Sequence, residues 1–168
     1  MTSQSLPRTG VVRGPEAVPL VKGPLGALRL AGAAETGGLA ALVVHDLAPR
    51  ALGSPVHTHT REDEWSYVLS GEVGVQVGDE TFTAGPGDLV LKPRSVPHAF
   101  WNPADEPARL LEVITPGGFE DYFAALGEAF AAGGPDRERM AAVAERFGLH
   151  LDPASIPQLA RAHGLVLS

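Results

Sequence analysis

Apolar residues in the first two-thirds of the chain occur in short runs that turn residues interrupt at close spacing. The residues at 73, 75 and 77 are all valine, and this period of two indicates a strand with one buried face. Strands at this density in about 100 residues predict a sandwich or a barrel. We expect strands over residues 25–30, 39–46, 64–70, 72–77, 80–84, 88–91, 99–102 and 109–115.

From residue 117 the apolar period changes to that of a helix. Aromatic and aliphatic residues recur on one helical face at Phe119, Tyr122, Phe123, Leu126 and Phe130. Gly133–Gly134 is expected to end this helix, a second helix to follow with Phe147 on its apolar side, and a third to run over residues 155–163. We therefore divide the chain into a flexible N-terminal arm (1–17), a β-barrel (18–116) and a C-terminal helical extension (117–168).

Composition narrows the partners and the location. The chain of 168 residues lacks cysteine, which excludes disulfides and thiolate metal sites and agrees with a cytoplasmic protein. We expect no signal peptide at the N-terminus and no membrane-spanning segment, because long apolar stretches are absent. A net charge of -7 disfavours nucleic acid as a partner.

A cluster of metal-binding residue types lies between and at the ends of the predicted strands. His57 and His59 are two residues apart, so in a strand both imidazoles share a face. Glu64 follows at the start of the next apolar run, and His98 stands beside Pro97. Three imidazoles and one carboxylate suit a first-row transition metal and leave coordination positions open. A lone His-x-His pair has little meaning, because such pairs are often surface residues without a role.

The full spacing resembles the two motifs of the cupin superfamily. Gly53-x3-His57-x-His59-x4-Glu64-x6-Gly71 resembles the first motif, and Gly87-x5-Pro93-x-Ser95-x2-His98-x3-Asn102 resembles the second. Gly53 is closer to the histidines than is usual, and Ser95 replaces the usual glycine, which is strained if that turn needs a positive φ.

The cupin resemblance implies an all-β double-stranded β-helix, the jelly-roll barrel. It also implies one divalent transition metal, Fe, Ni, Mn, Co, Cu or Zn, on His57, His59, Glu64 and His98. Asn102 is interpreted as a structural residue that hydrogen-bonds backbone groups at a strand end.

A narrower resemblance concerns the run 57–71 and the segment 116–123, which are similar to small bacterial cupins grouped with quercetin 2,3-dioxygenases. This implies an oxidoreductase, a quercetinase-like dioxygenase acting on a small aromatic or enol-type compound, with Glu64 also serving as a catalytic base. Two alternatives stay open: a binding cupin without turnover, and an isomerase of sugars or keto compounds. The predicted interior, rich in valine, looks too apolar for a sugar.

Further residues are assigned from strand parity. Ser66 and Val68 share parity with Glu64, and Phe100 with His98, so we expect them to line a small-molecule pocket or the barrel core. His45 is expected to be a buried histidine with a hydrogen-bond partner, with pocket lining as the alternative.

The remaining expectations concern the surface. The run Arg61–Glu62–Asp63 is predicted to be a solvated loop. In one alternative these residues orient the metal ligands or the pocket mouth; in the other, Glu62 replaces Glu64 as a ligand. Trp65, Tyr67 and Leu69 fall on the outer face of their strand. Exposed strand edges and the N-terminal arm favour a homodimer.

Overall fold

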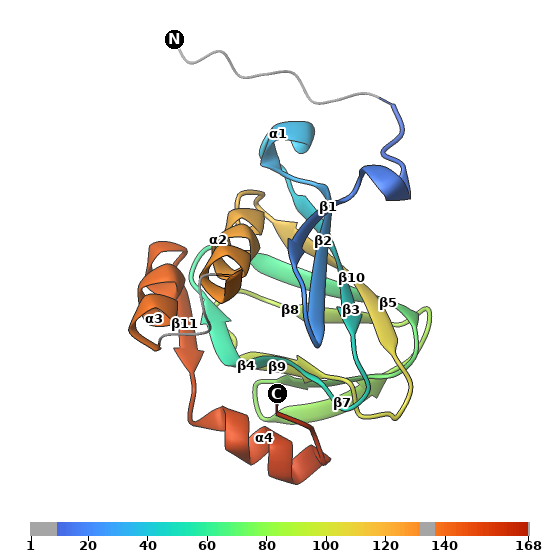
Figure 1. The fold of residues 1–168 in the computed structure, drawn as a ribbon, viewed down its shortest axis with the longest axis vertical. Helices are drawn as coiled ribbons and strands as arrows, with labels where there is room; N and C mark the ends of the chain where they lie inside the picture. Colours follow the sequence, from blue (N-terminus) through green and yellow to red (C-terminus); the bar gives the residue numbers. More distant parts are fainter. Residues whose placement is uncertain (1–9, 132–136, 168) are drawn as a thin grey trace.

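The protein folds into two antiparallel sheets that face each other, as the computed structural model of residues 10–131 and 137–167 shows (Figure 1). The larger sheet has the order β1 (Val18–Val21), β2 (Leu25–Ala31), β3 (Ala41–Leu47), β10 (Ala108–Thr115), β5 (Asp63–Ser70) and β8 (Leu89–Lys92). The smaller has the order β11 (Leu149–Asp152), β4 (Leu52–His59), β9 (His98–Trp101), β6 (Val73–Val77) and β7 (Glu80–Ala84). The predicted all-β jelly-roll barrel is confirmed.

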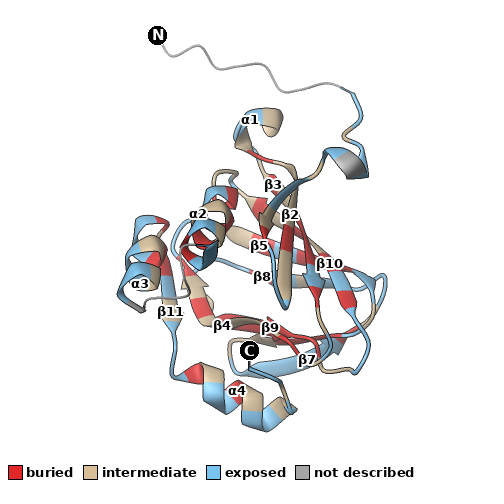
Figure 2. Ribbon diagram, in the orientation of Figure 1, coloured by how far each residue is buried: buried red, intermediate tan, exposed pale blue. Residues whose placement is uncertain are grey.

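Alternation along the strands builds the barrel interior. In β10 the residues at 108, 110, 112 and 114 are buried, and in β5 those at 64, 66 and 68 are buried. Figure 2 shows buried stretches on strands of both sheets. One apolar cluster fills the barrel around Val68, Val75, Phe100 and Leu110.

Short helices flank the barrel. They are a 3₁₀ turn (Gly14–Glu16), α1 (Ala33–Thr36), α2 (Glu120–Ala131), α3 (Arg137–Arg146) and α4 (Ser155–His163). Phe119, Tyr122, Phe123 and Leu126 are buried as predicted, but Phe130 is exposed. The four buried residues belong to a second apolar cluster, which packs against one end of the barrel. The expected stop at Gly133–Gly134 lies outside the described residues.

The C-terminal extension also supplies a strand that the sequence did not predict. Its β11 pairs with β4 and sets Leu149 opposite His59 and Leu151 opposite His57. The segment that follows α3 therefore supports the strand that carries the histidine pair.

Candidate metal site

Three neighbouring strands bring together the four predicted metal ligands. His57 and His59 end β4, Glu64 begins β5, and His98 begins β9 opposite His57. All four residues are buried, and one ligand atom from each lies within 4.8 Å of the others. The sequence therefore predicted the cluster, and the structure holds a buried group able to bind a metal ion.

Hydrogen bonds orient the imidazoles toward this cluster. Nδ1 of His57 lies 2.9 Å from the carbonyl of Pro55, and Nδ1 of His98 lies 2.9 Å from that of Val96. Each carbonyl accepts from Nδ1 and leaves Nε2 free to donate its lone pair to a metal.

His59 differs, since both its ring nitrogens are buried without a hydrogen-bond partner. Its Nε2 lies 3.3 Å from Oε1 of Glu64. Buried polar atoms are rarely left unpaired, and a metal ion bound between these side chains would satisfy Nε2. The donor set thus fits a transition metal.

Burial and neighbouring charges tune the protonation of the ligands. Burial, reinforced by the other imidazoles, holds the pKa of His57 well below its usual value. Burial likewise lowers the pKa of His98, although the Glu64 carboxylate, whose Oε2 lies 3.2 Å from Nε2 of His98, opposes this. For Glu64, burial raises the pKa, but the neighbouring Lys92 ammonium and the surrounding histidines outweigh it and hold the pKa well below its usual value. Neutral imidazoles and an ionised carboxylate are the forms that bind metals.

The barrel interior contains an ionic network that sequence reasoning missed. Nζ of the fully buried Lys92 donates to Oε2 of Glu64 at 3.0 Å and to Oε2 of Glu112 at 2.8 Å. The Ser66 hydroxyl lies 3.0 Å from each Glu112 oxygen. The interior that was predicted to be too apolar for a sugar therefore also contains charged and hydroxyl side chains. The sequence signal for Glu112 was its strand parity, because it lies on the same face of β10 as Leu110 and Ile114, two buried apolar residues.

The charges of this network depend on one another. For Lys92, burial lowers the pKa, but the carboxylates of Glu112 and Glu64 raise it by more. The pKa therefore lies above its usual value, and the side chain stays protonated. Burial raises the pKa of Glu112 to about 7, with Lys92 opposing and Glu64 adding to the rise. His45 is also buried, and its Nδ1 lies 3.2 Å from the carbonyl oxygen of Gly26. Burial lowers the pKa of His45 to about 4. The expected buried, partnered histidine at position 45 is thus found.

The charged run before Glu64 is not a uniformly solvated loop. Glu62 is 5% exposed, and its Oε2 lies 3.7 Å from Nδ1 of His59. Asp63 pairs with Arg94, which lowers the pKa of Asp63 to about 2. The prediction of a solvated loop is therefore wrong for Glu62. This carboxylate lies beside the outer nitrogen of His59, and the ligand group contains Glu64 instead.

The other predicted residues are placed as follows. Ser66, Val68 and Phe100 are buried inside the barrel, Ser66 in the ionic network and the other two in the apolar cluster. Their role as pocket lining stays a prediction. Asn102 donates to the carbonyls of Ala48 and Glu106, at 3.0 and 2.8 Å, as expected of a structural residue.

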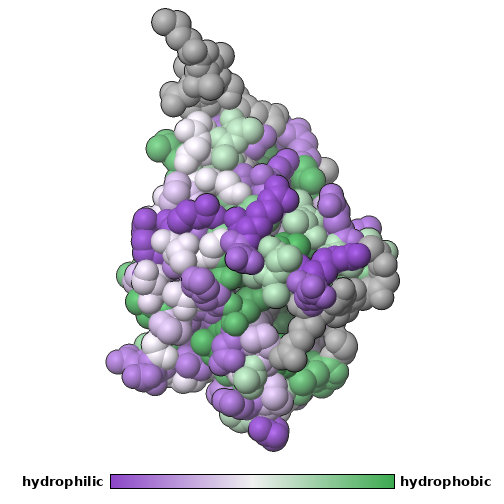
Figure 3. Space-filling view, turned by 90° about the vertical axis from the view of Figure 1, so that its left-hand side faces the viewer, coloured by the Kyte–Doolittle hydropathy of each residue, from purple (hydrophilic) through white to green (hydrophobic). Residues whose placement is uncertain are grey.

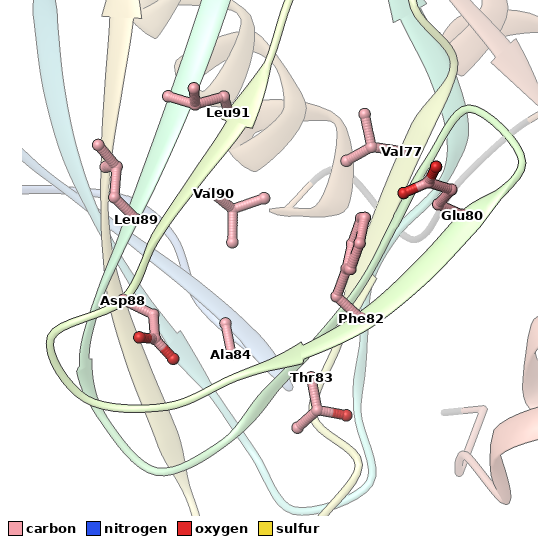
Figure 4. Close-up of a pocket in the computed structure, with 9 residues that line it drawn as sticks. All are labelled: Val77, Glu80, Phe82, Thr83, Ala84, Asp88, Leu89, Val90 and Leu91. Carbon is pink, nitrogen blue, oxygen red and sulfur yellow. The ribbon is translucent and has the colours of Figure 1, made fainter.

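A groove of about 460 Å³ opens between the edge strands β7 and β8 (Figure 4). Val77 and Val90 point toward the gap between these strands, whereas Leu89 and Leu91 point away from it. None of the four His and Glu residues of the metal site lines this groove. Another pocket, of about 370 Å³, is lined by Glu62 and Phe119, both neighbours of His59.

Comparisons with known proteins agree with this geometry. Residues 43–114 match the family model of the cupin domain. A search of curated protein sequences finds no match. No helix among the described residues is long and apolar enough to cross a membrane.

Solved structures share the fold. A predicted oxalate decarboxylase from Thermotoga maritima aligns with a TM-score of 0.58 and 23% identity, over 64% of this chain and 99% of that one. A nucleoside dehydratase aligns with a TM-score of 0.55 and 15% identity, over 68% and 88% of the two chains.

A sugar phosphate isomerase of the cupin superfamily from Silicibacter pomeroyi aligns with a TM-score of 0.50 and 30% identity. The alignment covers 55% of this chain and 59% of that one, so the match spans little more than half of the relative. These relatives carry different activities on one fold, so function has to be argued from the site. Residues 43–114, less than half of the chain, thus match the cupin domain model, and the solved structures share the barrel fold.

Proposed function

We propose that the protein is a metal-dependent, quercetinase-like oxygenase that acts on a small aromatic or enol-type compound. The observation that carries this proposal is the buried group of three imidazoles and one carboxylate whose ligand atoms lie within 4.8 Å. His57, His59, Glu64 and His98 would hold one divalent metal. When bound, that metal supplies a Lewis acid with an open position for a substrate oxygen.

The residues around the site have separable tasks. Lys92 fixes Oε2 of Glu64, so the carboxylate is held in one orientation. An ionised Glu64 accepts a proton from a substrate hydroxyl and so acts as the base. Val68 and Phe100 keep the neighbouring barrel space apolar, which excludes water from a reactive substrate.

Oxygen consumption tests the proposal. The protein is stripped of metal, reconstituted separately with Fe, Ni, Mn, Co, Cu or Zn, and supplied with flavonols or catechols in an oxygen electrode. We expect uptake in at least one redox-active form, lost in the His57→Ala/His98→Ala variant and reduced in Glu64→Gln. Absence of uptake in every metal form would overturn the oxygenase.

A second candidate is a non-redox isomerase of sugars or keto compounds. The observation that favours it is the polar network of Lys92, Glu112 and Ser66, which supplies the hydrogen-bonding groups that such substrates need. Incorporation of deuterium from D₂O into a keto sugar under anaerobic conditions would identify it. Ligand binding without either reaction would instead indicate a binding cupin.

We also propose that the protein forms a homodimer through the outer face of β5 and β8. Trp65 pairs with Leu91 and Tyr67 with Leu89 across these strands, and all four side chains are 40–58% exposed. Such a continuous apolar surface is typical of an interface. Light scattering should give a dimer for the wild type and a monomer for Leu91→Lys; a monomeric wild type would contradict the proposal.

A further inference from the structure

A charged pocket lies over the outer side of His59. It has a volume of about 370 Å³ and is formed by the loop between β4 and β5, the segment between β10 and α2, and the end of α3 with the residue that follows it. Its charged lining consists of Arg61, Arg146 and Glu62. The pocket thus carries an excess of positive charge on a chain whose net charge is -7. The molecular face on the side of α3 and β11 mixes hydrophilic side chains with a narrow apolar strip (Figure 3).

Two aromatic rings form part of the wall, beside the segment Pro116–Gly118, and one of them connects this pocket to the metal site. Phe119 and Phe147 line it, and their ring centroids are 6.2 Å apart. The Phe119 ring also meets the His59 ring edge to face, with centroids 4.5 Å apart. A single aromatic side chain therefore separates the pocket from a predicted metal ligand.

Both guanidinium groups have local partners that keep them at the pocket. Nε of Arg61 lies 3.5 Å from Oε1 of Glu62, and the Arg146 guanidinium lies 5.2 Å from the centre of the Phe147 ring. Both arginines are largely exposed, so a ligand can reach their remaining donors. Guanidinium groups bind carboxylates with paired hydrogen bonds.

The floor of the pocket holds a polar atom without a partner. Glu62 is 5% exposed, and its Oε2 has no hydrogen-bond donor among the described residues. Because an unpaired buried acceptor is unfavourable, this oxygen is a place for a hydroxyl donor. The two guanidinium groups favour an anionic ligand, the aromatic rings favour a planar one, and the unpaired acceptor favours one with a hydroxyl group.

We propose that this pocket binds a hydroxylated aromatic carboxylate and is the entrance to the metal site. Arg61 and Arg146 select the carboxylate, Phe119 and Phe147 pack on the ring, and Glu62 accepts from the hydroxyl. The assignment as an entrance rests on the proposed metal-dependent function, whereas the binding itself needs no metal.

The test compares two probes that differ by one carboxylate. Binding of 3,4-dihydroxybenzoate and of catechol to the metal-free full-length protein is measured by calorimetry at low salt. We expect the wild type to prefer the benzoate by about tenfold, since two charge pairs add modestly to affinity. The Arg61→Gln/Arg146→Gln variant should bind both probes equally.

The matched control is Arg139→Gln, which removes the same charge from an exposed position of α3 outside the pocket. It should keep the preference of the wild type. Equal affinity for both probes in the wild type, binding of neither, or a preference that survives loss of both arginines would overturn the proposal. Because no metal is present, the result stands whether or not oxygen uptake is observed.

Discussion

Removal of the Lys92 ammonium tests the energetic account of the barrel interior. In Lys92→Met the buried Glu64 and Glu112 carboxylates lose the cation that lies 3.0 and 2.8 Å from them. Loss of one partner from a buried ion pair costs about 3–5 kcal/mol, because the remaining charge stays buried. A domain has a stability of about 5–15 kcal/mol, so this single change should remove a large share of it.

The predicted loss depends on pH because Glu112 can take up a proton. The pKa of Glu112 in the folded protein is already raised to about 7, and without Lys92 it rises further. A carboxyl whose folded pKa exceeds its unfolded value favours folding at low pH and loses that contribution as pH rises. The destabilisation by Lys92→Met should therefore be larger at pH 8.5 than at pH 6.5.

Urea unfolding of metal-free protein, followed by circular dichroism, measures this effect. The double variant Lys92→Met/Glu112→Gln should recover much of the loss, because it removes one stranded charge and keeps a polar group beside Ser66. Lys22→Met, at an exposed lysine, should change stability by less than about 0.5 kcal/mol. A loss below about 1 kcal/mol for Lys92→Met at both pH values would refute the reasoning.

Further substitutions probe other parts of the fold in the metal-free protein. The pKa of His45 is lowered to about 4 by burial, so the unfolded chain binds a proton first and stability falls as pH drops from 6.5 toward 4. In urea titrations His45→Gln should lessen that fall by about 1.4 kcal/mol per pH unit, and an unchanged slope would contradict the assignment. Gly74→Ala should cost about 1–3 kcal/mol in thermal unfolding, because a Cβ there would overlap the Trp101 ring; the control Gly85→Ala has room, and equal melting of the two would argue against this packing. Ser95→Gly should stabilise by about 1 kcal/mol, because Ser95 has φ of 64°; a lower denaturation midpoint would show that the serine makes a compensating contact.

Much of the fold could be predicted because local pattern and tertiary position agree. The strand expected over 80–84 and the helix over 155–163 have the bounds found in the structure. Ser95, where a serine replaces the motif glycine, adopts the positive φ that would strain it, and the motif glycine Gly71 also has a positive φ. The strands β1, β4 and β11 lie outside the ranges expected from the sequence. Of these, β1 and β11 have only four residues each and depend on pairing with a neighbouring or distant strand.

The metal cluster could be predicted because its spacing is fixed along the chain, whereas the ionic network could not. Lys92 follows an apolar run and lies on the same face of β8 as Val90. Even so, its position inside the barrel was not predicted from the sequence. The three charges of Lys92, Glu64 and Glu112 compensate one another only in the folded barrel. Glu62 likewise shares a pocket with Phe119 and Arg146, which lie far away in sequence.

Metal content tests the central claim most directly. The full-length protein, purified without a histidine tag, is analysed by elemental mass spectrometry beside His57→Ala/His98→Ala. We predict about one equivalent of a divalent transition metal in the wild type and loss of that metal in the variant. Absence of metal from the wild type even after reconstitution, or equal metal in both proteins, would contradict a site built on these histidines.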